Sequence, residues 1–244
     1  MRIGLIGDSL TQGVLGSAYA TRLRRALPDD TLVNLGVGGD TVSSLLRRIR
    51  RLPTRDRFDL AFLWVGVNDI VSDDRPLIRI TGSLLPQRPA SNLDAFRQDY
   101  VWALDIVRAC APRVVAVSPL IKGEKVDGEL NQRLGPVSDI ICKAATDRED
   151  VTYLDLRSEI LAILARSARP DYMQGKPLRV LWDLLSARSD RTIDRRSRRR
   201  GYAYSLDGLH LNSQGADYVA ERFLREIARQ RKAVPGSEVK NQPE

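Results

Sequence analysis

Five short apolar runs, separated by stretches with helical periodicity, limit what this chain can fold into. Each run is continuous rather than alternating, as in strands that helices cover on both faces of a parallel sheet. Right-handed crossovers then leave few permitted topologies. The pattern predicts an α/β fold with a five-stranded, parallel, doubly wound sheet. The runs span residues 3–6, 31–35, 60–65, 114–117 and 151–156.

The stretches between these runs have the periodicity of helices that cover a sheet. Over residues 42–49, apolar side chains recur every three or four residues and the arginines are expected on the outer face. A further helix is expected over about residues 131–146, interrupted early by Pro136. The last helix has the clearest start, because Asn212 or Ser213 can cap it.

Length and composition favour one globular domain. The chain has 244 residues, of which 43% are hydrophobic and 29% charged, and a chain of this size can bury a full core. No apolar run approaches the roughly 18 residues that a membrane-spanning helix needs, and the first run is shorter than the roughly 7 to 15 apolar residues of a signal peptide. We therefore expect a cytoplasmic protein, with one domain over residues 1–232 and a flexible tail over residues 233–244.

The residue types that most often bind metals are scarce. His210 is the only histidine, and Cys110 and Cys142 are the only cysteines. Their spacing fits neither a redox motif nor a zinc motif, and a structural zinc site needs about four such ligands. Both cysteines are interpreted as buried free thiols. Composition leaves a carboxylate-only site for Mg²⁺ or Ca²⁺ open, but no loop has its spacing, so no metal or cofactor is expected.

Much of the net charge of +8 falls in one arginine-rich run. Between residues 188 and 200, seven arginines face two aspartates, a composition typical of a solvated or mobile loop. The run ends a longer insertion, about residues 164–200, that exceeds what one helix and a turn would use. Two interpretations of this insertion stay open: a lid beside a site, or a helical excursion that only covers surface.

Four short stretches have the residues that chemistry needs, each at a predicted strand end or at the start of the last helix. They contain Ser9, Gly39, Asn68, and Asp207 with His210. Because parallel strands bring their carboxyl ends to one edge of the sheet, these residues should meet there. An Asp three positions before a His can accept from one imidazole nitrogen while the other nitrogen faces a nucleophile.

This set contains one candidate for each role in the hydrolysis of a small-molecule ester. Ser9 would attack, His210 would act as general base and then general acid, and Asp207 would orient the imidazole. The backbone N–H groups of Ser9 and Gly39 and the side-chain amide of Asn68 would stabilise the developing oxyanion. Each residue also has a structural interpretation, as a turn, a helix cap or a packed histidine. The conjunction of all five favours catalysis.

Taken together, the four stretches resemble the signature blocks of the SGNH, or GDSL, hydrolase family. The blocks are Gly-Asp-Ser-Leu, a glycine before Asp-Thr, Gly-x-Asn-Asp and Asp-x-x-His, and all four occur in the family's order. The resemblance implies a flavodoxin-like three-layer α/β/α sandwich and an esterase, lipase, thioesterase or deacetylase that needs no cofactor. It also implies the quartet Ser9, Gly39, Asn68 and His210, with Asp207 completing a triad. No block covers the insertion, so substrate choice is expected to depend on it.

A competing hypothesis is a nucleotide or nucleic-acid binding module. It would use the glycine loop at residues 36–39, which follows a strand and precedes a helix, together with the arginine-rich run. The dinucleotide fingerprint is incomplete, because Thr41 stands where its third glycine belongs, and the hypothesis gives the Asp-x-x-His stretch no task. A third interpretation keeps the hydrolase and assigns the insertion to a partner or an anionic surface. Oligomeric state and the physiological ester stay open.

Overall fold

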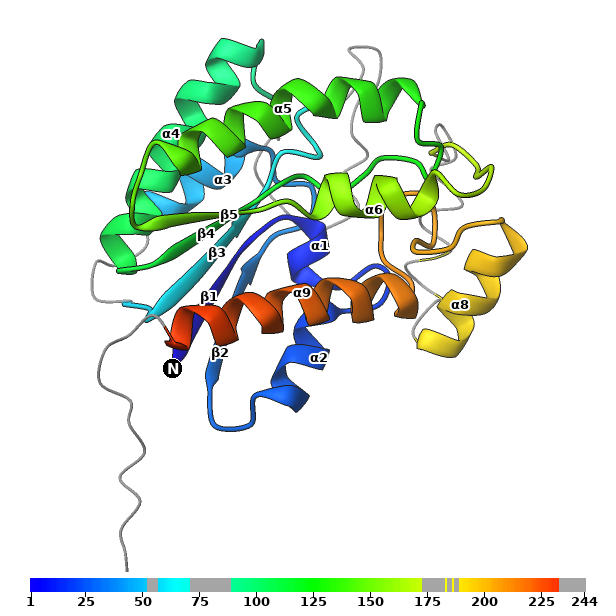
Figure 1. The fold of residues 1–244 in the computed structure, drawn as a ribbon, viewed down its shortest axis with the longest axis horizontal. Coiled ribbons are helices and arrows are strands. Elements are labelled where there is room, and N and C mark those ends of the chain that lie inside the picture. Colours follow the sequence, from blue (N-terminus) through cyan, green and yellow to red (C-terminus); the bar gives the residue numbers. More distant parts are fainter. Residues whose placement is uncertain (52–56, 71–88, 173–182, 184–185, 187–188, 233–244) are drawn as a thin grey trace, which may run out of the picture.

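Five parallel strands form the central sheet of the computed structural model, which describes residues 1–51, 57–70, 89–172, 183, 186 and 189–232 (Figure 1). The strand order is β2-β1-β3-β4-β5. Every neighbouring pair is parallel, which confirms the predicted α/β fold. The strands are β1 (Arg2–Gly7), β2 (Thr31–Gly36), β3 (Leu60–Trp64), β4 (Val114–Val117) and β5 (Val151–Leu154).

Helices cover both faces of the sheet and complete a three-layer sandwich (Figure 1). In this view α3 (Val42–Ile49), α4 (Leu93–Cys110) and α5 (Glu129–Thr146) lie above the sheet, while α2 (Tyr19–Ala26) and α9 (Ser213–Lys232) lie below it. The chain changes face because right-handed crossovers run toward one edge from β1 to β2 and toward the other from β2 to β3. The carboxyl ends of β1 and β3 flank this switch point, where open α/β sheets bind their ligands.

Three further helices follow strands or loops at the carboxyl edge of the sheet. These are α1 (Ser9–Gln12), α6 (Leu156–Leu164) and α8 (Asp190–Arg199). The fifth strand ends earlier than predicted, because the side chain of Asp155 accepts a hydrogen bond from Ser158 N at 3.0 Å and caps α6.

Helix α5 continues through Pro136, so the predicted interruption is wrong. A proline normally disfavours helical geometry at the residue before it, because its ring meets that residue's Cβ. Here the preceding residue is Gly135, which has no Cβ for the ring to meet. The glycine therefore removes one of the steric conflicts that a proline introduces into a helix, although the backbone hydrogen bond that a proline cannot donate is still lost.

A cluster of aromatic side chains fixes α9 against the sheet. Phe223 of α9 is fully buried and stacks on Phe62 of β3, with the ring centroids 4.3 Å apart. The ring of Phe223 also packs against Tyr19 of α2, at 5.0 Å, and Trp64 of β3, at 5.9 Å. Since α9 begins three residues after His210, this packing also holds the segment that carries His210 at the edge of the sheet.

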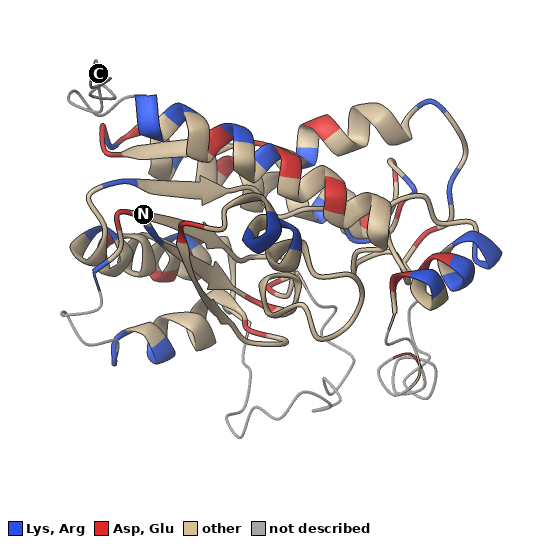
Figure 2. Cartoon of the chain, turned by 90° about the horizontal axis from the view of Figure 1, so that it is seen from below, with Lys and Arg blue, Asp and Glu red and all other residues tan. Residues whose placement is uncertain are grey.

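The arginine-rich run is a helix over Asp190–Arg199, so the predicted loop is wrong for these residues. Ser189 caps α8 by accepting from Thr192 N. Arg196 and Arg200 both pair with Asp183, at 2.7 Å, and the Asp183 side chain is 2% exposed. Figure 2 shows α8 at one end of the molecule with basic and acidic positions along it. Part of the charge in this run therefore neutralises a buried carboxylate.

Some expectations from the sequence lie outside the described residues. They concern the apolar part of the insertion and the tail at residues 233–244. The interpretation of the insertion as a lid stays a prediction. None of the helices in the described part of the chain has the length and apolar character that crossing a membrane requires.

Candidate active site

Ser9 is presented by a tight turn between β1 and α1. Asp8 lies at the N-cap of α1 and accepts from Leu10 N at 3.0 Å, so Ser9 is the first helical residue. Gly7 makes this turn possible, because a Cβ there would lie 2.4 Å from Thr11 Oγ1 and 2.5 Å from Trp64 O. The Ser9 side chain is thus held just beyond the carboxyl end of a central strand.

His210 and Asp207 lie beside Ser9, although the serine is 201 positions away from the histidine. Ser9 Oγ is 3.2 Å from His210 Nε2, and His210 Nδ1 is 2.8 Å from Asp207 Oδ2. The other carboxylate oxygen, Oδ1, accepts from the backbone N–H groups of Leu209 at 3.0 Å and His210 at 2.9 Å. The structure therefore brings three of the five predicted residues into one line of contacts.

Burial and the attraction between Asp207 and His210 have opposite effects on the pKa values of these two residues. Burial works to raise the pKa of Asp207, but the charge of His210 and the hydrogen bonds to the carboxylate lower it below its usual range. Burial likewise works to lower the pKa of His210, and the Asp207 carboxylate outweighs it, so that this pKa is raised. The imidazolium form is thus stabilised by the carboxylate behind it.

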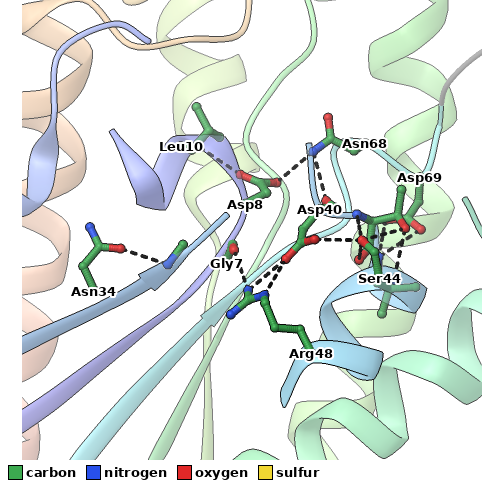
Figure 3. A network of polar contacts seen from close by, with 12 residues as sticks. Gly7, Asp8, Leu10, Asn34, Asp40, Ser44, Arg48, Asn68 and Asp69 are labelled. Carbon is green, nitrogen blue, oxygen red and sulfur yellow. Dashed lines mark hydrogen bonds and ion pairs between the residues drawn. The ribbon is translucent and has the colours of Figure 1, made fainter. Parts of the chain in front are cut away.

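Asn68, another predicted residue, lies between Asp8 and Asp40, the residue that follows the predicted Gly39 (Figure 3). Asn68 Nδ2 donates to Asp40 O at 3.0 Å and lies 3.5 Å from Asp8 Oδ2. Gly39 precedes Asp40 and has a φ of 75°, which favours glycine. Asn68 therefore links the glycine loop after β2 to the turn that presents Ser9.

An ion pair that the sequence did not predict holds this loop (Figure 3). Arg48 of α3 donates to Asp40 Oδ2 through Nε at 3.0 Å and through Nη2 at 2.8 Å, and Nη2 lies 3.4 Å from Gly7 O. Asp40 Oδ1 accepts from Ser44 Oγ at 2.9 Å. The expectation that arginines of this helix lie on its outer face is wrong for Arg48, whose side chain is 25% exposed. Its guanidinium joins the end of β1 to the loop that contains Gly39.

Asp69, which follows β3, is hydrogen-bonded to the start of α3. Its carboxylate accepts from Val42 N, the first residue of that helix, at 3.0 and 3.2 Å. Burial raises the pKa of Asp69 to about 7. The residue after Asn68 thus anchors the start of the helix that carries Arg48.

Two more ionisable groups lie buried close to the line of contacts. Burial raises the pKa of Asp8 to about 7 and lowers the pKa of Lys122 to about 8. Lys122 Nζ lies 3.4 Å from Val67 O and 5.6 Å from the centre of the Tyr172 ring.

In the described part of the chain, no cluster of His, Cys, Asp and Glu side chains is arranged to hold a metal ion. Cys110 is buried, Cys142 is half-buried, and neither forms a disulfide.

Comparison with known proteins identifies the family. The model of the GDSL-like lipase/acylhydrolase family matches residues 5–218. The chain belongs to this family. Membership makes it an esterase, as the sequence predicted. A comparison with curated proteins returned no match.

Solved structures of other esterases share the fold of this GDSL-like chain. The acetyl xylan esterase AlAXEase superposes with a TM-score of 0.63 at 21% identity, over 93% of this chain and 100% of that chain. A lipase/acylhydrolase from Enterococcus faecalis gives 0.61 at 17% identity, over 97% and 99%. An acetylxylan esterase from Geobacillus stearothermophilus gives 0.62 at 18% identity, over 93% of both chains. At such identities the similarity establishes the fold.

Three residues around this GDSL-like site carry no motif signal: Arg48, Lys122, and Glu124, which accepts from the backbone N–H groups of residues 203–205. Lys122 and Glu124 come shortly after β4, and their nearness to a strand's carboxyl end was the available signal. Arg48 lies in the last turn of α3 among other arginines, so nothing in its local sequence distinguishes it.

Proposed function

We propose that this esterase cleaves carboxyl esters through an acyl-enzyme on Ser9. The observation that carries the proposal is the line of contacts from Ser9 Oγ through the imidazole of His210 to Asp207, with separations of 3.2 and 2.8 Å. The arrangement fits a nucleophile, a general base and a group that orients the base.

In the first half of the reaction, His210 Nε2 takes the proton of Ser9 while Oγ attacks the carbonyl carbon. Asp207 keeps the proton of the imidazole on Nδ1 and stabilises the imidazolium that forms. His210 then donates its proton to the departing alcohol. In the second half, His210 activates a water that attacks the acyl group and releases Ser9.

The oxyanion would be held by three donors: the N–H groups of Ser9 and Gly39, and the side-chain amide of Asn68. One amide hydrogen of Asn68 is engaged with Asp40 O at 3.0 Å, whereas the contact to Asp8 at 3.5 Å is long. The second hydrogen is thus only weakly engaged and suits an oxyanion that appears during reaction. A raised pKa of Asp8, about 7, reduces the negative charge beside that oxyanion near neutral pH.

A panel of p-nitrophenyl esters from acetyl to palmitoyl tests the proposal. Acetyl esters come first, because two of the similar solved structures are acetyl xylan esterases. Wild type should hydrolyse at least one member, and Ser9→Ala and His210→Ala should each abolish the burst of p-nitrophenol that marks an acyl-enzyme. Hydrolysis that survives both substitutions would refute the mechanism.

The glycine loop that motivated the nucleotide-binding alternative has a structural role. A Cβ at Gly36 would lie 2.3 Å from Gln12 N and 2.6 Å from Thr11 C, so this glycine serves the close packing of α1 on β2. Thr41 caps α3 by accepting from Ser44 N. The Lys and Arg positions of the described residues are spread over several helices in Figure 2 rather than gathered along one element.

A further inference from the structure

The loop between β4 and α5 supports the segment that carries Asp207 and His210. Its central residue is Glu124, whose side chain is fully buried. One carboxylate oxygen, Oε2, accepts from Ala203 N at 2.6 Å. The other, Oε1, accepts from Tyr204 N at 2.8 Å, from Ser205 N at 2.9 Å and from Ser205 Oγ at 2.7 Å. Three consecutive backbone N–H groups therefore converge on one carboxylate.

These contacts continue to the residue next to Asp207. Ser205 Oγ, which donates to Glu124, accepts from Gly208 N at 3.0 Å. Gly123 N donates to Gly208 O at 2.7 Å. A Cβ at Gly208 would lie 3.2 Å from Gly123 Cα, and its φ is 96°. The turn with Asp207 thus packs directly on the backbone beside Glu124.

The chemistry of Glu124 exceeds what a turn requires. Burying a carboxylate is costly unless hydrogen bonds replace its water, and a backbone carbonyl or neutral side chain could receive one or two N–H groups without that cost. Within the described residues no ion pair to Glu124 occurs, so its hydrogen bonds alone compensate its burial. Charge-assisted bonds of this kind are short and directional, and they fix a segment more closely than neutral bonds do.

We propose that Glu124 is a positioning residue for ester hydrolysis, which holds residues 203–208 so that Asp207 and His210 stay aligned with Ser9. The inference rests on the proposed mechanism. Glu124 acts through the turn and does not touch the substrate. A displacement of about 1 Å at a reacting group can cost roughly 100-fold in rate, so the effect should appear in kcat rather than in KM.

The test is Glu124→Gln, which keeps the size of the side chain. In either orientation the new NH₂ group faces a backbone N–H, so the segment must shift. We expect kcat to fall about 10- to 100-fold with KM changed less than about threefold. The acid limb of kcat/KM should move to lower pH, because a weaker contact with Asp207 lets burial lower the pKa of His210.

A second readout does not depend on turnover. His210 is the only histidine, so protein labelled with ¹⁵N-histidine gives one imidazole whose titration is followed by NMR. Its midpoint should fall in the variant. An unchanged midpoint overturns the inference, whether kcat is unchanged or reduced, because a merely structural residue would lower stability without moving it. If wild type proves to use another nucleophile, the proposed mechanism fails while this titration still tests positioning.

Glu226→Gln is the matched control. Glu226 is buried in α9 and accepts from Gln230 Nε2 at 2.7 Å, on the half of the helix remote from His210. This variant should lose stability without a change in the titration. If Glu124→Gln does not fold, Ser205→Ala takes its place. This substitution removes one donor to Glu124 and the acceptor for Gly208 N, and kcat and the titration midpoint of His210 then test the inference.

Discussion

The substitution Asp207→Asn should reverse the tautomer of the imidazole. The backbone N–H groups of Leu209 and His210 donate to Asp207 Oδ1 at 3.0 and 2.9 Å, so the amide oxygen of the replacement stays on that side. The NH₂ group then takes the place of Oδ2, 2.8 Å from Nδ1. A donor at that position requires Nδ1 to be an acceptor. The proton therefore moves to Nε2, which can no longer accept the proton of Ser9.

The expected loss follows from that tautomer. A triad whose histidine is held in the wrong tautomer loses about 10⁴ in kcat, which corresponds to about 5.4 kcal/mol at about 1.36 kcal/mol for each factor of ten. Hydrolysis of p-nitrophenyl acetate measures the rate. NMR of the ¹⁵N-labelled imidazole measures the tautomer directly: wild type should carry its proton on Nδ1 and the variant on Nε2.

The same pair fixes a pH dependence whose sign can be worked out. The pKa of His210 is raised on folding, so its stabilisation is complete below the unfolded value of about 6.5 and is lost as pH rises through the folded value. The pKa of Asp207 is lowered, so its stabilisation is present above about 3.9 and is lost as pH falls through the folded value. The difference in Tm between wild type and Asp207→Asn should be largest between about pH 4 and 6.5.

Asp194→Asn is the control for the predictions about Asp207→Asn. Asp194 accepts from Ser213 N at 3.0 Å and from Ser213 Oγ at 2.6 Å, so it holds the start of α9 without contacting the imidazole. It should lower Tm and leave the tautomer unchanged. The reasoning would be wrong if Asp207→Asn kept its imidazole proton on Nδ1, or if its kcat stayed within about tenfold of wild type.

Three further substitutions probe the surroundings of the site. Asn68→Ala should lower kcat about 10²- to 10³-fold, or about 2.7 to 4 kcal/mol of transition-state stabilisation; a rate within about threefold of wild type in the p-nitrophenyl assay would remove Asn68 from the oxyanion hole. Arg48→Met leaves the buried carboxylate of Asp40 without its cation, and urea unfolding should show a loss of about 1 to 3 kcal/mol, below the roughly 3 to 5 of a fully buried pair because Arg48 is 25% exposed. An unchanged urea midpoint would show that the ion pair does not hold the loop. Phe223→Ala removes the ring that stacks on Phe62 and should reduce the free energy of unfolding by about 3 to 5 kcal/mol; a loss below about 1 kcal/mol would contradict the role of this ring in fixing α9.

The strands could be predicted, and five candidate site residues could be selected, because the signals for both are local. A continuous apolar run, a glycine after it and a polar residue two positions later need no knowledge of the rest of the chain. Ser9 and Asn68 stand in such a pattern, and the parallel order of the strands brings both to one edge of the sheet. His210 has a different local signal, which is Asp207 three positions before it. The end of β5 was predicted too late because Asp155, which caps α6, lies within the apolar run at residues 151–156. The signal of a helix cap is also local, but here it competes with the signal of a strand.

The supporting residues could not be predicted because their partners are distant in sequence. Glu124 accepts from residues about eighty positions later, and Arg196 and Arg200 are distinguished from neighbouring arginines only by the position of Asp183. A charged residue on a helix ordinarily faces water, and only the three-dimensional fold shows which one turns inward. Sequence reasoning therefore named candidate site residues and missed many of the contacts that hold them.

The separation of Ser9 from His210 also bears on when the protein becomes active. A polypeptide that stopped after β5 would contain the five strands of the described sheet but would lack His210, the proposed general base. His210 reaches Ser9 only when the segment before α9 docks, and Phe223 contributes to that docking. Loop closure over 201 positions is entropically costly and is completed after local structure has formed. The appearance of ester hydrolysis would therefore mark the last stage of folding. If the chain were cut between β5 and α8, the two fragments would be active only after they reassembled.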